Sequence, residues 1–202
     1  MKIIGITGGV GAGKTQILAY IEKNYKAFVI RTDETAKLLQ TPGYPCYEKI
    51  VEYLGREILR EDGSIDRQKM AQAIFSDQEK LAQINGIIHP QVNAYVAEKI
   101  EEERKKGEVS YFFIESALLI ENHYDEICDE MWYIDTSEDI RRQRLKENRG
   151  YSDEKINDII SKQRSEQEFR KHCQIHLNND KELQAVYQQI DKELGGNVTW
   201  RK

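Results

Sequence analysis

Short apolar runs alternate with amphipathic segments at the start of the chain, and this pattern predicts an α/β fold. Lys2–Thr7 is an apolar run that ends at a glycine-rich stretch, which is typical of a buried parallel strand. Apolar residues then recur at helical spacing within Lys14–Asn24, and Ala27–Ile30 forms a second apolar run. A strand, a helix and a strand in such close succession predict a βαβ unit with a right-handed crossover in a parallel sheet.

The next segment, from Asp33 to about residue 106, has mostly helical periodicity. Turn-forming pairs interrupt it at Pro42-Gly43, Asp62-Gly63 and His89-Pro90. Because helices tend to end at such pairs, we expect a series of short helices. The expected helices are Glu34–Gln40, Tyr47–Leu54, Arg67–Ile74, Gln78–Ile88 and Pro90–Lys106.

The second half of the chain contains two more strand patterns, Val109–Ile114 and Glu130–Asp135, which complete the predicted core sheet. A polar, helical and arginine-rich segment follows, and a short strand is expected at Ile175–Leu177. The chain is expected to close with a helix at Lys181–Leu194 and a frayed tail at Gly195–Lys202.

Size and composition narrow the class of protein. With 202 residues, one domain with inserts is expected. The net charge of −5 is not that of a nucleic-acid-binding protein, which usually carries a basic face. The cysteines Cys46, Cys128 and Cys173 are scattered and odd in number, which argues against a disulfide framework and a zinc site. No export signal and no long apolar stretch is found, so we expect a cytoplasmic protein with no membrane partner.

The most informative motif lies between the first strand and the first helix. Gly8, Gly13, Lys14 and Thr15 fit the pattern G-x-x-x-x-G-K-[ST] of a phosphate-binding loop. In such a loop, backbone N–H groups and a helix N-terminus hold phosphate oxygens, the lysine reaches the β- and γ-phosphates, and the Thr binds Mg²⁺. A plain glycine-rich turn would not explain the Lys-Thr pair. The expected ATP contacts in this loop are Gly8, Gly9, Val10, Gly11, Ala12, Gly13, Lys14 and Thr15.

Two carboxylates follow predicted strands, where ligands of open parallel sheets gather. Asp33 comes just after the second strand, and it is interpreted as an acceptor of the proton from an attacking hydroxyl or as a water-mediated Mg²⁺ ligand. The alternative for Asp33 is a helix cap. Glu115 ends the third strand and is a second-sphere candidate for the metal, with a solvated strand end as the alternative.

The arginine-rich segment after the fourth strand is interpreted as a lid, because phosphoryl transfer needs mobile positive charge and the exclusion of water. Arg144 is the arginine singled out there, although a solvated helix is the usual meaning of such a stretch. His89 has no step to perform in phosphoryl transfer to a hydroxyl, so a structural or substrate-contacting role is expected.

Further motifs follow the loop in a defined order. They are Gly5–Thr15, Arg31–Asp33, Pro42-Gly43, Leu54-Gly55, Asp62–Arg67, His89-Pro90, Glu115–Glu121, Arg144-Leu145, Gln163 and Asn178. In order and spacing they are similar to the motifs of dephospho-coenzyme A kinases, and the resemblance covers nearly the whole chain. Other nucleotide kinases share the first motif but not the rest.

This resemblance implies transfer of phosphate from ATP, with Mg²⁺, to the ribose 3′-hydroxyl of dephospho-coenzyme A, the last step of coenzyme A synthesis. It implies that Asp33 is the general base or orients the hydroxyl, and that Lys14 and Arg144 neutralise charge. Adenine would lie near Asn178.

By the same resemblance, the acceptor contacts would be Asp33, His89 and Leu118, and the metal would be bound by Thr15 with Glu115 in its second sphere. The implied fold is a three-layer P-loop α/β fold with a parallel core sheet, a helical acceptor-binding insert and an arginine-bearing lid. The expected core is 1–34, 107–137 and 173–202, the acceptor region is 35–106, and the lid is 138–172. A monomer or weak homo-oligomer is expected.

Several positions depart from the family pattern. Arg31 and Glu115 replace aspartates, Ala117 replaces a proline, Cys173 replaces the late aspartate, and Asn148 replaces the second lid arginine, with Arg149 one place along. Arg31 changes the local charge by about two units, and on the same strand face as Asp33 it would weaken that base and repel Mg²⁺. Two alternatives therefore stay open: a kinase of another nucleoside or nucleotide, and a nucleotide-binding regulatory protein that has lost transfer.

Overall fold

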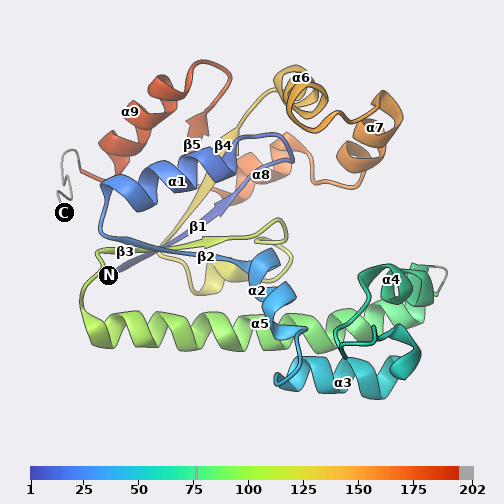
Figure 1. Cartoon of the computed structure of the whole chain (residues 1–202). Coiled ribbons are helices and arrows are strands. Elements are labelled where there is room, and N and C mark those ends of the chain that lie inside the picture. The colour runs from blue at the N-terminus through green and yellow to red at the C-terminus, as the bar shows by residue number, and fades with distance from the viewer. Residues whose placement is uncertain (76, 196–202) are drawn as a thin grey trace. The chain divides into compact units, whose positions relative to one another are not determined.

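The computed structural model describes residues 1–75 and 77–195, and it contains a five-stranded sheet with the order β2-β3-β1-β4-β5 (Figure 1). The strands are β1 (Lys2–Thr7), β2 (Ala27–Arg31), β3 (Tyr111–Glu115), β4 (Glu130–Asp135) and β5 (Ile175–Asn178). β1 pairs in parallel with β3 and with β4, and β4 pairs in parallel with β5. The predicted parallel α/β fold is confirmed.

The chain divides into two compact units, and each is described by itself. The first unit contains Met1–Ile30 and the chain from Glu103 onward, and the second contains Arg31–Glu102. The sheet and the phosphate-binding motif belong to the first unit, whereas the second unit is helical.

In the first unit, helices cover both faces of the sheet, which gives the three layers. α1 (Lys14–Asn24) and α9 (Leu183–Glu193) bury apolar side chains in a common core with Trp132 of β4. Tyr133, the next residue of β4, stacks on Phe169 of α8 (Glu166–His172) with ring centroids 5.1 Å apart. Because successive strand residues point to opposite faces, Trp132 and Tyr133 mark the two packed sides of one strand.

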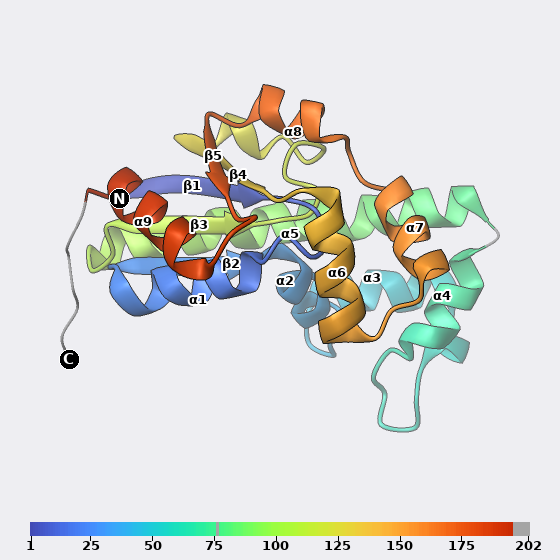
Figure 2. The ribbon, with the colours of Figure 1, turned by 90° about the horizontal axis from the view of Figure 1, so that it is seen from above.

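The polar segment after β4 forms three helices, α6 (Glu138–Arg149), α7 (Asp153–Ser161) and α8, which Figure 2 shows as separate orange coils. α6 ends at Gly150, whose φ of 60° is the left-handed conformation that glycine adopts easily. Ser152 is the N-cap of α7 and Ser165 is the N-cap of α8, and their side chains accept hydrogen bonds from backbone N–H groups in the first turn of the helix. Local capping therefore explains why the segment breaks where it does. A short 3₁₀ helix, η2 (Tyr124–Glu126), precedes β4.

The second unit contains α2 (Thr32–Leu39), α3 (Pro45–Leu54), the 3₁₀ helix η1 (Arg56–Ile58), α4 (Arg67–Phe75) and most of α5 (Gln78–Lys106). Ile50 and Ile58 are buried in it. The hydroxyl group of Tyr47 donates a 2.5 Å hydrogen bond to the carbonyl oxygen of Gly63, which ties α3 to the turn before α4. This unit therefore has apolar and polar contacts of its own.

The expected helix break at His89-Pro90 is wrong. α5 runs through both predicted helices as one continuous helix with Pro90 inside it (Figure 1). Proline removes one helical N–H group, so the carbonyl oxygen of Gly86 loses its usual partner. Gly86 and Pro90 are both exposed, and solvent can bind that carbonyl group, which lowers the cost of proline at this position. The expected tail lies outside the described residues, apart from Gly195.

Candidate active site

The phosphate-binding motif lies at the point where β1 ends and α1 begins. Gly13 is the N-cap of α1 and has a φ of 92°, which an L side chain adopts only with strain. Its carbonyl oxygen accepts the first helical hydrogen bonds, from the N–H groups of Gln16 and Ile17. Thr15 is exposed in the first turn of this helix. The N-terminus of α1 therefore directs its first backbone N–H groups and its positive dipole end at the loop, as an anion site requires.

Lys14 connects the loop to the neighbouring strand. Its Nζ donates to the carbonyl oxygens of Gly8 at 2.6 Å and Gly9 at 3.4 Å, and it lies 4.0 Å from Oε1 of Glu115. Ile6 of β1 and Glu115 of β3 are register partners, so parallel pairing brings this carboxylate beside the loop. The side chains of Lys14 and Glu115 are only 15% and 17% exposed, which strengthens their attraction relative to that of a surface pair.

Asn179, Thr136 and Arg144 form a polar wall, defined here by these three residues, beside Ala12 and Gly13 of the loop. Asn179, which is 1% exposed, donates from Nδ2 to the carbonyl oxygen of Ala12 at 2.7 Å. The Thr136 hydroxyl donates to the same oxygen at 3.2 Å. Arg144, on α6, donates from Nη2 to the carbonyl oxygen of Asn179 at 2.8 Å. A Cβ atom on Gly13 would lie 2.5 Å from Nδ2 of Asn179, so glycine is needed here for close approach as well as for φ.

Polar atoms without partners gather around this loop. Among the described residues, the buried side-chain atoms that make no hydrogen bond are Thr7 Oγ1, Arg144 Nη1 and Asn179 Oδ1. Thr7 is the last residue before the loop, and the other two belong to the wall behind Gly13. A buried polar group without a partner costs free energy, so these atoms indicate that a polar ligand binds here.

A second arginine of α6 lies on the loop. Arg141 is 7% exposed and donates from Nε to the carbonyl oxygen of Thr136 at 3.1 Å and from Nη1 to Oε1 of Gln163 at 3.2 Å. The same Oε1 atom accepts the backbone N–H of Val10 at 3.3 Å. Arg141 precedes Arg144 by one helical turn, so both arginines lie on the same side of α6.

The sequence profile of the dephospho-CoA kinase family matches residues 2–185. The chain belongs to the dephospho-CoA kinase family. Its curated relatives include the dephospho-CoA kinase of Streptococcus mutans, 34% identical over 196 residues with 96% of each chain covered. The dephospho-CoA kinase of Carboxydothermus hydrogenoformans is 31% identical over 190 residues, which cover 94% of this chain and 91% of the relative.

Solved structures agree with this family at the level of the fold. TT1252 from Thermus thermophilus is 26% identical, with a TM-score of 0.79 and 96% of each chain covered. Shikimate kinase from Bacteroides thetaiotaomicron is 17% identical, with a TM-score of 0.53 and coverage of 96% of this chain and 98% of its own. The second comparison shows a shared fold only.

Asn178, where the family resemblance puts adenine, has an exposed side chain whose Oδ1 accepts the N–H of Asp180 at 3.3 Å. The residue that contacts the loop is its neighbour, Asn179. Leu118, an expected acceptor contact, is 43% exposed in the turn after β3. Sequence reasoning missed Asn179 and Arg141. The signals that were present are the adjacency of Asn179 to Asn178 and the one-turn spacing of Arg141 from Arg144.

Asp33 and His89 belong to the helical unit. β2 ends at Arg31 and α2 begins at Thr32, so Asp33 is exposed in the first helical turn. Asp33 is not the N-cap, since that position is Arg31. Strand alternation therefore stops before Asp33, and the premise that Arg31 and Asp33 share a strand face does not hold. His89 is half-buried within α5.

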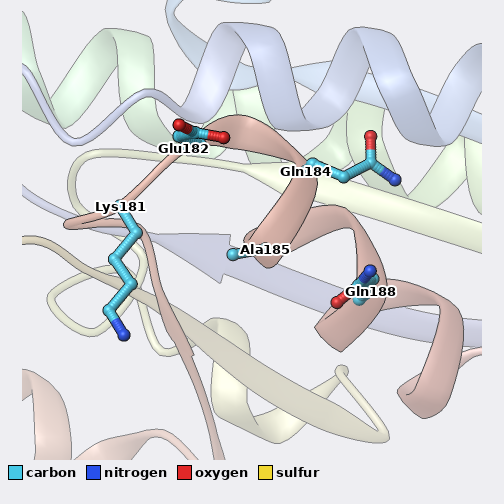
Figure 3. A pocket seen from close by; sticks show the side chains of 5 residues that line it. All are labelled: Lys181, Glu182, Gln184, Ala185 and Gln188. Carbon is cyan, nitrogen blue, oxygen red and sulfur yellow. The ribbon is translucent and has the colours of Figure 1, made fainter.

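A separate hollow of about 520 Å³ opens at the start of α9, and Figure 3 shows it lined by Lys181, Glu182, Gln184, Ala185 and Gln188. The hollow lies just after Asn179 in the sequence. The side-chain amides of Gln184 and Gln188 offer it both hydrogen-bond donors and acceptors. None of these residues contacts the phosphate loop in the hydrogen bonds described above. In the described part of the chain, no helix is both long and apolar enough to cross a bilayer.

Proposed function

We propose that the chain transfers the γ-phosphoryl group of ATP to the ribose 3′-hydroxyl of dephospho-coenzyme A, giving coenzyme A and ADP. The observation that carries this proposal is the family match from residue 2 to residue 185. Many kinases with other acceptors share the phosphate loop, so the loop alone does not identify the acceptor. The family match also covers the helical unit, Arg31–Glu102. The two curated relatives named dephospho-CoA kinase match this chain over 190 and 196 residues.

The loop is proposed to bind the triphosphate of ATP. The backbone N–H groups of Gly8–Thr15 and the N-terminus of α1 would bind phosphate oxygens. Lys14 would exchange its bonds to loop carbonyl oxygens for bonds to the β- and γ-phosphates, which its three N–H donors allow. The Nη1 atom of Arg144, buried and without a partner in the described structure, would stabilise the charge that develops on the migrating group. The adenine contact is assigned to Asn178 and the turn around it.

The acceptor is proposed to bind the helical region 35–106, with contacts from Asp33, His89 and Leu118. Asp33 would accept the proton of the attacking 3′-hydroxyl or orient that hydroxyl in line with the γ-phosphorus atom. The remaining segments are assigned as the core at 1–34, 107–137 and 173–202 and the lid at 138–172. Closure of such a lid would exclude water, which otherwise competes with the acceptor hydroxyl.

The residues at the loop fit a magnesium ion. Thr15 would bind Mg²⁺ through its hydroxyl group, and Glu115 would bind it through water. Bound Mg²⁺ supplies positive charge to the β- and γ-phosphate oxygens. Among the described residues, no group of three or more His, Cys, Asp or Glu residues forms a metal site.

We also propose that the protein acts on small molecules in the cytoplasm, as a monomer or weak homo-oligomer, with neither nucleic acid nor membrane as a partner. The net charge of −5 and the scattered cysteines support this interpretation.

The proposal is tested by ADP formation with the purified full-length chain, ATP and Mg²⁺ across a panel of acceptors. Dephospho-coenzyme A is expected to stimulate ADP formation well above adenosine, AMP and other nucleosides. Coenzyme A is the matched control, because its 3′-hydroxyl already carries phosphate. Equal stimulation by another nucleoside, without a response to dephospho-coenzyme A, would contradict the acceptor assignment. ATP binding without turnover on any acceptor would favour a regulatory protein.

A further inference from the structure

We infer that Arg141 and Gln163 form a clasp, defined here as this pair of side chains, that positions the Gly9–Val10 part of the phosphate loop for nucleotide binding. Arg141 is a positioning residue in this inference: it acts on the nucleotide through Gln163 and the loop backbone. The inference rests on the proposed function only in that the loop binds ATP. It does not depend on the identity of the acceptor.

The first observation is the burial of a guanidinium group against the loop. Arg141 is 7% exposed, and burial of a charged group is costly unless its N–H groups are paired. Its Nε bonds the carbonyl oxygen of Thr136 at 3.1 Å, and its Nη1 bonds Gln163 at 3.2 Å. Arg141 also forms a long ion pair with Glu166, in which Nη2 lies 3.9 Å from Oε1. That carboxylate is half-exposed, so most of the positive charge stays available beside the loop.

The second observation is the orientation of the Gln163 amide group. Its Oε1 accepts from both Nη1 of Arg141 and the backbone N–H of Val10. A guanidinium group has only donors, so it selects the orientation in which the amide oxygen faces it. The same oxygen is then available to the Val10 N–H. Without Arg141, the Val10 N–H would be the remaining donor that holds the amide in this orientation, so the orientation would be less strongly fixed.

The third observation is the lack of a side chain at Gly9. A Cβ atom there would lie 2.3 Å from Nη1 of Arg141 and 3.1 Å from Oε1 of Gln163. The first distance would force Arg141 to move and the second is tighter than most contacts of a Cβ atom, so glycine permits the clasp to lie directly on the loop backbone. Three sequence positions that are far apart, 9, 141 and 163, thus form one contact. Both parts of the clasp come from the segment that carries the candidate lid arginine, so lid position and loop shape are linked.

The test measures ATP binding by calorimetry with the full-length chain and no acceptor. Arg141→Met and Gln163→Leu are each expected to weaken ATP binding by about 10-fold, because a charge-assisted or buried hydrogen bond is lost. Arg142→Met is the matched control, since Arg142 is the adjacent arginine of α6 and pairs with Glu138 and Asn157 instead. It is expected to leave the ATP dissociation constant within about twofold of wild type.

A double-mutant cycle separates positioning from general stability. If Arg141 acts through Gln163, Arg141→Met/Gln163→Leu should bind ATP within about threefold of the weaker single variant, well short of the product of the two losses. Gln163→Glu keeps an acceptor oxygen for both partners, so amide hydrogen exchange at Val10 should stay close to that of wild type in this variant, whereas its added negative charge by itself opposes phosphate binding. Amide hydrogen exchange at Val10 should accelerate in Gln163→Leu and not in Arg142→Met.

The inference is overturned if both single variants bind ATP as wild type does, or if their losses multiply in the double variant. It is also overturned if melting temperature falls while ATP affinity of the folded protein does not. If Arg141→Met does not fold, Gln163→Leu and Gln163→Glu carry the same test. Failure of the acceptor assignment would appear only in the acceptor panel, so the two failures are distinguishable.

Discussion

Replacement of Gly13 by alanine tests the geometry of the phosphate loop. Gly13 combines a φ of 92° with a close approach to Asn179, and a Cβ atom would lie 2.5 Å from Nδ2. Ordinary contacts begin at 3.4 Å, so the amide group would have to retreat by about 0.9 Å. That displacement would break its 2.7 Å hydrogen bond to the carbonyl oxygen of Ala12.

The expected cost has two parts. An L residue in the left-handed region costs about 1–2 kcal/mol. Loss of a hydrogen bond that leaves a buried polar group unpaired costs about 1–3 kcal/mol more. Gly13→Ala should therefore lower the free energy of unfolding by about 2–5 kcal/mol, and it should weaken ATP binding at least about 10-fold, because the loop N–H groups shift.

Gly107→Ala is the matched control. Gly107 belongs to the same unit and has a φ of 66°, but a Cβ atom there meets nothing within 4 Å. Its cost should be the backbone strain alone, about 1–2 kcal/mol. ATP affinity should stay within about twofold of wild type.

The measurements are denaturant unfolding and ATP calorimetry on both variants and the wild type. This prediction is refuted if Gly13→Ala binds ATP with wild-type affinity. It is also refuted if Gly107→Ala weakens ATP binding as much as Gly13→Ala does, because the loss would then come from strain in general and not from the contact with Asn179.

Three further results are expected. Lys14→Ala should lower kcat by about 100-fold or more, since an ammonium group that stabilises transferring phosphate is lost; an unchanged kcat in a steady-state assay would contradict this. Asp33→Asn should lower kcat by about 100- to 10,000-fold while ATP affinity is unchanged, and a wild-type kcat would exclude its role as base. Burial raises the pKa of Cys173 to about 12 and also raises the pKa values of Cys46 and Cys128. At about pH 8 all three thiols should therefore be protonated, and they should react with a thiol reagent only after denaturant is added. Because the folded state holds these protons more tightly, stability should fall as pH rises above the ordinary thiol pKa of about 9; rapid labelling of the native protein would refute the assignment.

Most of the sheet could be predicted from the sequence because β1, β2, β3 and β4 are short, mainly apolar runs. Lys2–Thr7 and Glu130–Asp135 were expected with the bounds that the structure gives. The continuous helix α5 could not be predicted in the same way, because the proline at position 90 is a local signal that a helix ends. The cost of Pro90 depends on whether solvent reaches the unpaired carbonyl group of Gly86, and exposure is a property of the folded chain.

Some residues of the candidate site could likewise be predicted from the sequence, and others could not. Lys14 and Thr15 belong to a contiguous motif whose chemistry needs that spacing, so the sequence was sufficient to find them. Arg141 and Asn179 act on the loop from positions more than a hundred residues away. Arg141 looks like any arginine of a solvated helix until its 7% exposure is known. The pairing of Glu115 with Lys14 likewise depends on the register between β1 and β3.

The position of the new phosphate group in the product tests the proposed reaction most directly. The full-length chain is incubated with ATP, Mg²⁺ and dephospho-coenzyme A, and the product is analysed by ³¹P NMR and mass spectrometry beside authentic coenzyme A. One added phosphate is expected on the ribose 3′-oxygen, with ADP formed in equal amount. Phosphate on another position, or ADP formed with no phosphorylated acceptor, would contradict it.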